Sequence, residues 1–189
     1  MVQRIAVLGD SHFPGRAREL PEKILFALRK FSPTLVIFTG DATSGETFDK
    51  IAKSAPGAEI KAVKGEKDYL DLPTELVLEL EGVKMGVVHG EFAKPPGNKT
   101  EIENYGRSLG VQAIIFGHSH KLFVGRAGKL LLVNPGSFTG IPLPGEEPES
   151  PSAVFLTLEF GRVSARSLVL SKGRLQETTE EFVILPEIR

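Results

Sequence analysis

Short apolar runs recur along the chain, separated in its first part by polar segments of helical length. Such runs span residues 4–8 and 35–38, and a further run spans residues 111–116. Runs of four to six apolar residues are typical of strands that are buried on both faces of a sheet. We therefore expect interior parallel strands at these three positions.

Two segments between the early runs have the spacing of amphipathic helices. Residues 20–31 place their apolar side chains on one helical face, with Pro21 in the first turn. A second helix is expected over residues 46–52, introduced by Ser44, and a strand over residues 59–63 follows it. Strands that alternate with helices indicate a parallel sheet.

The later part of the chain changes to pairs of adjacent strands joined by short turns. These β-hairpins are expected over residues 75–88 around Glu81-Gly82-Val83, over residues 121–133 turning at Ala127-Gly128, and over residues 152–170 turning at Gly161-Arg162. Together the two patterns predict an α/β fold of two packed mixed β-sheets flanked by helices. The length suits a single domain over residues 1–189.

Composition excludes several classes of protein. The chain has 41% hydrophobic and 25% charged residues, a net charge of −1 and no cysteine. The absence of cysteine rules out a disulfide framework, and no apolar stretch is long enough for a membrane span or a signal peptide. The near-zero charge gives no overall attraction to nucleic acid. We expect a cytoplasmic protein without membrane or nucleic-acid partners. The sequence is compatible with both a monomer and a homo-oligomer.

All four histidines of the chain follow apolar runs. Asp10 and His12 come after the run at residues 4–8, and Asp41 after the run at residues 35–38. His89 follows residues 85–88, and the pair His118 and His120 follows residues 111–116. In an extended chain residues i and i+2 point to the same side, so Asp10 and His12 are expected to face one point.

These groups are predicted to form a metal site. In open α/β sheets, ligands bind outside the carboxyl ends of the strands, and imidazole and carboxylate groups are ligands for divalent metals. The alternative is that each histidine is a hydrogen-bonded residue near the core and each carboxylate caps a helix or a turn. The recurrence of the same arrangement after four separate runs favours the metal site.

The ordered motifs resemble those of the calcineurin-like metallophosphoesterase superfamily. The matching segments are Asp10-Ser11-His12, Gly40-Asp41, a glycine-led loop at Gly65, His89-Gly90, and Gly117-His118-Ser119-His120. The chain is most similar to the small single-domain phosphodiesterase branch, which also includes the metallophosphoesterase-like subunit of the retromer coat. Asn134-Pro135-Gly136-Ser137 matches that branch as well. The likeness covers about residues 1–170, and it implies an αββα sandwich.

The resemblance implies two divalent metal ions. One ion would be held by Asp10, His12, Asp41 and His120, and the other by Asp41, the residue at position 66, His89 and His118. Asp41 would thus bridge the two ions. The mixed nitrogen and oxygen ligands suit manganese, our first candidate, or nickel, zinc or iron, better than calcium.

Position 66 departs from the family pattern. Where the family usually has Gly-Asn followed by His or Cys, this chain has Gly65-Glu66-Lys67-Asp68. The Glu66 carboxylate can still bind a divalent ion. Lys67 stands where many members carry a His thought to protonate the leaving group, and an ammonium is a poor acid at neutral pH but can stabilise phosphate charge. The alternative is that these residues form only a solvated charged turn.

The implied function is hydrolysis of a small phosphate ester by a hydroxide that the two ions generate from water, with Asp41, Lys67 and His118 as the catalytic candidates. The alternative function is a metal-binding scaffold of the retromer-subunit kind, with weak or no hydrolysis.

Two loops carry further hypotheses about substrate binding. Residues 13–18 place Arg16 and Arg18 where guanidinium groups can meet phosphate, or else form a solvated connection. Residues 140–151, which are rich in proline, are expected to lie near the site mouth and to select substrates.

Overall fold

Two β-sheets packed face to face form the centre of the molecule, which is a computed structural model that describes residues 2–184. The six-stranded sheet has the order β11 (Arg174–Val183), β10 (Arg162–Ser171), β9 (Ser152–Glu159), β1 (Gln3–Leu8), β2 (Leu35–Phe38) and β3 (Glu59–Ala62). The five-stranded sheet has the order β4 (Glu75–Leu80), β5 (Val83–Val88), β6 (Ala113–Ile115), β8 (Leu130–Pro135) and β7 (Leu122–Ala127). Both sheets are mixed.

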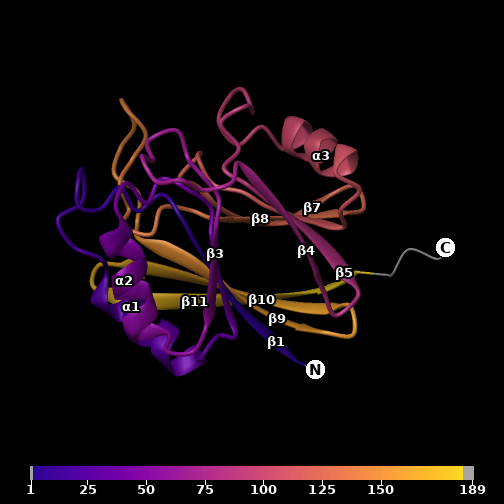
Figure 1. The fold of residues 1–189 in the computed structure, drawn as a ribbon, viewed down its shortest axis with the longest axis horizontal. Coiled ribbons are helices and arrows are strands. Elements are labelled where there is room, and N and C mark those ends of the chain that lie inside the picture. Colours follow the sequence, from indigo (N-terminus) through magenta and orange to yellow (C-terminus); the bar gives the residue numbers. More distant parts are fainter. Residues whose placement is uncertain (1, 185–189) are drawn as a thin grey trace.

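Helices cover the outer faces of both sheets (Figure 1). The helices α1 (Glu22–Phe31) and α2 (Gly45–Ser54) lie on the six-stranded sheet, and α3 (Lys99–Ser108) lies on the five-stranded sheet. The chain is therefore an α/β sandwich with the layer order α, β, β, α, as predicted. None of the three helices in residues 2–184 combines the length and the apolarity that crossing a bilayer requires.

Alternation along the central strands explains why their apolar runs are unbroken. In β1, Ile5 and Val7 belong to the core between the two sheets, whereas Ala6 and Leu8 belong to the core beneath α1 and α2. All four residues are fully buried. A strand covered on both faces needs apolar residues at every position, which is the pattern that predicted these strands.

The helix ends follow from local sequence. The Ser44 hydroxyl accepts a hydrogen bond from the backbone N–H of Glu46 and so caps α2, as Ser44 was expected to do. In α1 the expectation needs a small correction, because Pro21 is the cap residue and the helix begins at Glu22. α1 ends at Phe31, before Ser32 in a left-handed conformation with φ 48°.

Two elements were not predicted. The helix α3 buries only Ile102 and Gly106, so its apolar stripe is too narrow to give a clear helical period. The strand β11 is an edge strand in which most residues are exposed, so its sequence carries no apolar alternation. The three predicted hairpins are present, as β4–β5, β7–β8 and β9–β10, and β3 ends one residue earlier than expected.

Candidate metal centre

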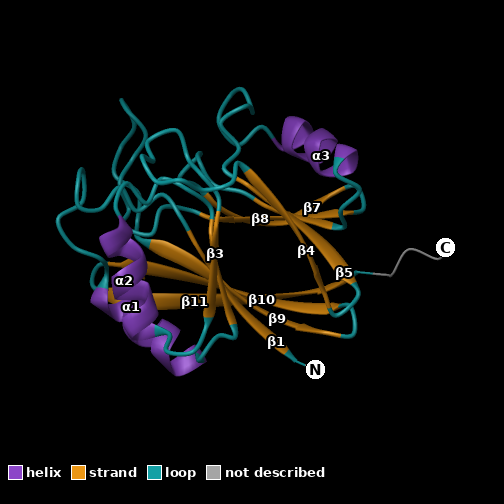
Figure 2. Ribbon diagram, in the orientation of Figure 1, coloured by secondary structure: helices purple, strands orange, loops and turns teal. Residues whose placement is uncertain are grey.

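Loops that follow four strands meet at one end of the sandwich. Figure 2 shows these loops gathered at the end of the sheets away from the N-terminus. The loops after β1 and β2 supply Asp10, His12 and Asp41, and the loops after β5 and β6 of the other sheet supply His89, His118 and His120. All six residues are buried, with at most 7% of their surface exposed. Residues far apart in sequence thus form one cluster.

The backbone at this cluster is not extended, which corrects one expectation. Asp10 and His12 have φ values of 51° and 48°, in the left-handed region, and His118 and His120 have φ values of 63° and 58°. Such conformations are unfavourable for residues other than glycine and persist only where surrounding contacts hold them. Here the N–H of Asp10 donates to the Gly40 carbonyl and the N–H of His12 to the Asp41 carbonyl, each at 2.9 Å. Sharp turns, rather than strand alternation, bring each pair together.

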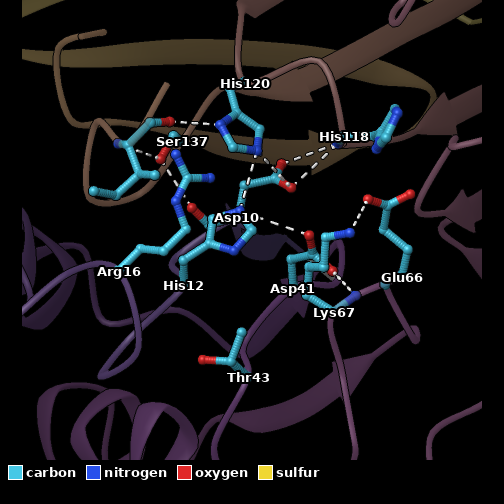
Figure 3. A network of polar contacts seen from close by, with 12 residues as sticks. Asp10, His12, Arg16, Asp41, Thr43, Glu66, Lys67, His118, His120 and Ser137 are labelled. Atoms are coloured by element: carbon cyan, nitrogen blue, oxygen red, sulfur yellow. Dashed lines mark hydrogen bonds and ion pairs between the residues drawn. The ribbon is translucent and has the colours of Figure 1, made fainter. Parts of the chain in front are cut away.

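One group of ligand atoms comes from Asp10, His12 and His120 (Figure 3). The Nε2 atoms of the two imidazoles lie 3.2 Å apart, and Nε2 of His120 lies 3.6 Å from Oδ1 of Asp10. The Nδ1 of His120 donates to the Ile141 carbonyl, which fixes its proton there and leaves a lone pair on Nε2. That lone pair points toward the other two ligand atoms, as a metal ligand requires.

A second group comes from Asp10, Asp41 and His89. The Nδ1 of His89 donates to the Thr39 carbonyl at 2.8 Å. In the neutral ring its buried Nε2 therefore carries a lone pair; this atom has no hydrogen-bond partner among the described residues and lies 3.8 Å from Oδ2 of Asp41. An orphaned buried acceptor beside a carboxylate is costly unless a cation or a water satisfies it. These residues fit a divalent metal ion.

The two carboxylates connect the two groups. Asp10 contributes to both. Oδ2 of Asp41 lies 3.6 Å from Nε2 of His12 in the first group and 3.8 Å from Nε2 of His89 in the second. A single oxygen that faces both groups is the geometry expected of a bridging ligand.

Three of the predicted site residues lie at the margin of this cluster. Within residues 2–184, His118 and Glu66 belong to neither group of ligand atoms, although the His118 ring packs edge-on against His89 with centroids 5.2 Å apart. The backbone N–H of His118 donates to Oδ2 of Asp10 at 3.0 Å. Lys67 forms an ion pair with Glu66 at 2.7 Å, and both side chains are substantially exposed. Glu66 and Lys67 therefore lie at the solvent-exposed margin of the cluster, where the backbone N–H of Lys67 donates to Asp41.

Burial and the neighbouring carboxylates set the pKa values of the residues in the cluster. It lowers the pKa of His12 to about 3 and that of His120 to about 4, so both rings are neutral at physiological pH. Burial, reinforced by the charge of Asp41, raises the pKa of Asp10 to about 7. For His89, burial acts to lower the pKa, but the carboxylates of Asp10 and Asp41 outweigh it and the pKa is raised. His12 and His120 are therefore neutral imidazoles, the state that binds divalent cations, whereas the raised pKa of His89 means that it holds a proton to higher pH than a free imidazole.

The segment at residues 137–142 joins several parts of the site. The Ser137 hydroxyl donates to the Asp10 carbonyl at 2.8 Å, the Ile141 carbonyl accepts from His120, and the Pro142 carbonyl accepts from Arg16 at 2.7 Å. The start of the 140–151 loop thus lies beside the cluster, as expected, while its role in selecting substrates stays a prediction. Sequence reasoning missed the carbonyl partners of the histidines, because backbone groups leave no residue-type signal.

The sandwich and the cluster at its strand ends together define the fold class of metallophosphoesterases. The chain belongs to the calcineurin-like phosphoesterase superfamily, whose domain model matches residues 3–160. Its motifs and its fold agree with the resemblance inferred from the sequence.

Known proteins of two kinds are similar to the chain. A probable metallophosphoesterase of Methanocaldococcus jannaschii is 37% identical over 135 residues, which cover 71% of this chain and 68% of that protein. Another, of Methanothermobacter thermautotrophicus, is 33% identical over 138 residues, covering 71% and 77%. The crystal structure of Vps29 from Entamoeba histolytica complexed with Zn²⁺ superimposes with a TM-score of 0.87 at 29% identity, covering 94% of this chain and 98% of that one.

Proposed function

We propose that the protein is a divalent-metal-dependent phosphoesterase that binds two ions and hydrolyses small phosphate esters, with phosphodiesters as the first candidates. One observation carries this proposal. Two groups of ligand atoms share Asp10, and one oxygen of Asp41 faces the imidazoles of both groups. Paired ion sites of this kind suit the displacement of a leaving group at phosphorus.

The ligand assignment combines the two groups with the ligand set that the family resemblance implies, in which Asp41 bridges and Asp10 serves the first ion. The first ion would be held by Asp10, His12, Asp41 and His120. The second would be held by Asp41, His89, His118 and Glu66, the last two completing it from the margin of the cluster. Manganese is the first candidate, with nickel, zinc or iron as the others. Divalent ions supply Lewis acidity, which polarises the phosphate ester and lowers the pKa of water at the site.

The protein residues orient and hold the reactants. The carbonyls of Ile141 and Thr39 keep the Nδ1 protons of His120 and His89 in place, so that both Nε2 lone pairs face inward. Arg16 is anchored on Pro142, and its charge contributes to the lowered pKa of His12 and of His120. Arg16 and Lys67 are therefore the cations placed to contact the negative charge of a phosphate ester.

The test is release of nitrophenol from bis(4-nitrophenyl) phosphate and from 4-nitrophenyl phosphate, with added Mn²⁺ or Ni²⁺ and with a chelator. We expect metal-dependent turnover that falls at least about 100-fold in Asp41→Asn, because the ions supply several kcal/mol of transition-state stabilisation. Asp49→Asn, at an exposed position of α2, is the matched control and should keep full activity.

The second candidate is a metal-binding scaffold with weak or no hydrolysis. The Glu66–Lys67 pair favours it, because a hydrogen bond from Lys67 to Glu66 raises the pKa of Lys67 and keeps its ammonium protonated at neutral pH. Such a group is a poor proton donor to a leaving group. The similarity to Vps29 over nearly the whole chain is compatible with this role. Calorimetry that shows two bound ions, without hydrolysis above the Asp41→Asn background, would decide for the scaffold.

A further inference from the structure

A buried carboxylate outside the ligand groups lies next to Asp41. The side chain of Asp68 follows β3 and is only 6% exposed. Its Oδ2 accepts hydrogen bonds from the backbone N–H groups of Asp41 at 2.8 Å and Gly65 at 2.9 Å. Its Oδ1 accepts from the N–H of Thr43 at 2.7 Å. One side chain thus binds three backbone amides in the loops after β2 and β3.

The contact is reciprocal. The backbone N–H of Lys67 donates to Oδ1 of Asp41 at 2.8 Å. Each loop therefore supplies a carboxylate that accepts from the backbone of the other loop. We call this arrangement of the Asp41 and Asp68 carboxylates, with the amides that they bind, the β2–β3 clasp.

The clasp holds a backbone that would not keep its shape alone. Asp41 and Thr43 have φ values of 56° and 61°, and Gly40 has 102°. Left-handed conformations at residues other than glycine are disfavoured and need external support. The loops also approach closely, since a Cβ at Gly65 would lie 2.2 Å from Oδ1 of Asp41. Without Asp68, amides in this crowded region would lose their acceptor.

The clasp also decides which oxygen of Asp41 faces the cluster. Oδ1 is engaged by the Lys67 amide, so the oxygen directed at His12 and His89 is Oδ2. Among residues 2–184, Asp68 belongs to neither group of ligand atoms, and both of its oxygens accept from backbone amides. Its effect on the cluster passes through Asp41.

We propose that Asp68 is a positioning residue that holds the Asp41 carboxylate in its bridging orientation and thereby sets the affinity of the site for divalent ions. This inference rests on the proposed metal-dependent function. The residue at position 67 contributes to the clasp through its backbone N–H, which every amino acid except proline provides, while its side chain pairs with Glu66.

The test compares Asp68→Asn and Asp68→Glu with Asp71→Asn, an exposed carboxylate three residues further along. Mn²⁺ affinity is measured by titration calorimetry on protein shown by circular dichroism to be folded. An amide can replace only one carboxylate oxygen, so we expect Asp68→Asn to weaken Mn²⁺ binding by about tenfold to 100-fold, the usual effect of losing a residue that orients a ligand. Asp68→Glu keeps both acceptors and should recover most of the affinity, and Asp71→Asn should match the unmodified protein.

The Mn²⁺ dependence of ester hydrolysis provides a second test of the role of Asp68. Asp68→Asn should need more Mn²⁺ for half-maximal turnover yet reach, at saturating Mn²⁺, a kcat close to that of the unmodified protein. A kcat that stays low at saturating metal would overturn the positioning role in favour of a direct catalytic one. Unchanged Mn²⁺ affinity in folded Asp68→Asn would overturn the proposal outright. The calorimetry tests the role of Asp68 even if no ester is hydrolysed. Failure of this inference can therefore be distinguished from failure of the proposed function.

The unmodified protein provides a check that does not depend on the variant folding. Amide hydrogen exchange measured by NMR, with Zn²⁺ as a diamagnetic ion, should show the amides of Asp41, Thr43 and Gly65 protected to a similar degree. Exchange of these amides as fast as that of exposed loop amides would overturn the clasp, whether or not Asp68→Asn folds.

Discussion

The Nε2 atoms of His12 and His120 face each other at 3.2 Å within the buried cluster. Because burial lowers the pKa of both rings, to about 3 and about 4, neither ring carries a charge at neutral pH that would repel a cation. The Nδ1 of His120 is committed to the Ile141 carbonyl, so its Nε2 presents a lone pair to His12. Two imidazoles crowded in this way, beside the Asp10 carboxylate, are satisfied best by an ion between them.

Divalent ions should therefore stabilise the fold. A ligand at 100 times its Kd adds about 2.7 kcal/mol to the free energy of unfolding, which corresponds to a rise in Tm of about 5–10 °C for a chain of this size. Differential scanning fluorimetry with Mn²⁺, and again after chelation, measures the shift. His12→Ala should abolish most of it. An identical Tm with and without metal would contradict the ligand assignment.

Metal affinity should rise with pH. The pKa of Asp10 is raised to about 7, mainly by burial, so below pH 7 the ion-free carboxyl holds a proton that a metal ion must displace. The raised pKa of His89 acts in the same direction, whereas His12 and His120 are already neutral in this range. We expect affinity to increase at least about tenfold per pH unit between pH 5 and 7 and to level off above. Calorimetry in buffers of different ionisation enthalpy counts the released protons, and affinity that is flat over this range would contradict the assignment.

Glu66→Asn should leave the ion count unchanged and keep or increase turnover. The substitution restores the amide that the family usually carries at this position, and it frees Lys67 from its ion pair with the Glu66 carboxylate. Metal content by inductively coupled plasma mass spectrometry and initial rates with bis(4-nitrophenyl) phosphate measure the two effects. Loss of one ion in this variant would show that the carboxylate is required at this site.

Lys67→Ala should lower turnover by roughly tenfold without changing metal content. The variant removes a cation placed to contact phosphate, but it keeps the backbone N–H that binds Oδ1 of Asp41. Lys64→Ala, at an exposed position of the same loop, is the control. Turnover equal to that of the control would leave Lys67 as a surface charge only.

Arg16→Ala should raise KM for phosphate esters by at least about tenfold and leave Mn²⁺ affinity within about threefold, since a charge-assisted hydrogen bond contributes about 1.5–3 kcal/mol. The matched control is Arg29→Ala, which removes an exposed arginine in the last turn of α1. Inhibition by inorganic phosphate should weaken in parallel with KM. A KM that changes equally in both variants would indicate a general charge effect rather than a contact from Arg16.

The sequence contained enough to predict the sandwich and the meeting of the histidines and aspartates. The reason is physical: β1, β2, β5 and β6 are covered on both faces, so their apolar runs are continuous, and the residues after their carboxyl ends meet at one edge. The elements that escaped prediction lack this signal. α3 buries a narrow stripe, and β11 lies at an exposed edge.

The finer geometry of the site was not predictable from residue types. His12 and His120 reach each other through left-handed turns, which no spacing rule indicates at residues other than glycine. The groups that orient His89 and His120 are the carbonyls of Thr39 and Ile141, and any residue supplies a carbonyl. Asp68 had the appearance of part of a charged turn, and only its burial and its three backbone contacts in the structure distinguish it from exposed neighbours such as Asp71.

The segment at residues 137–142 has a consequence for how the protein can evolve. Its successive carbonyls at Ile141 and Pro142 support a candidate metal ligand and a candidate phosphate contact. An insertion there would shift both supports together, whereas changes at the exposed tip, residues 144–148, which lies beyond these two anchors, would leave both supports in place. Sequence drift among close orthologues should concentrate at that tip, while the length of the preceding segment stays constant.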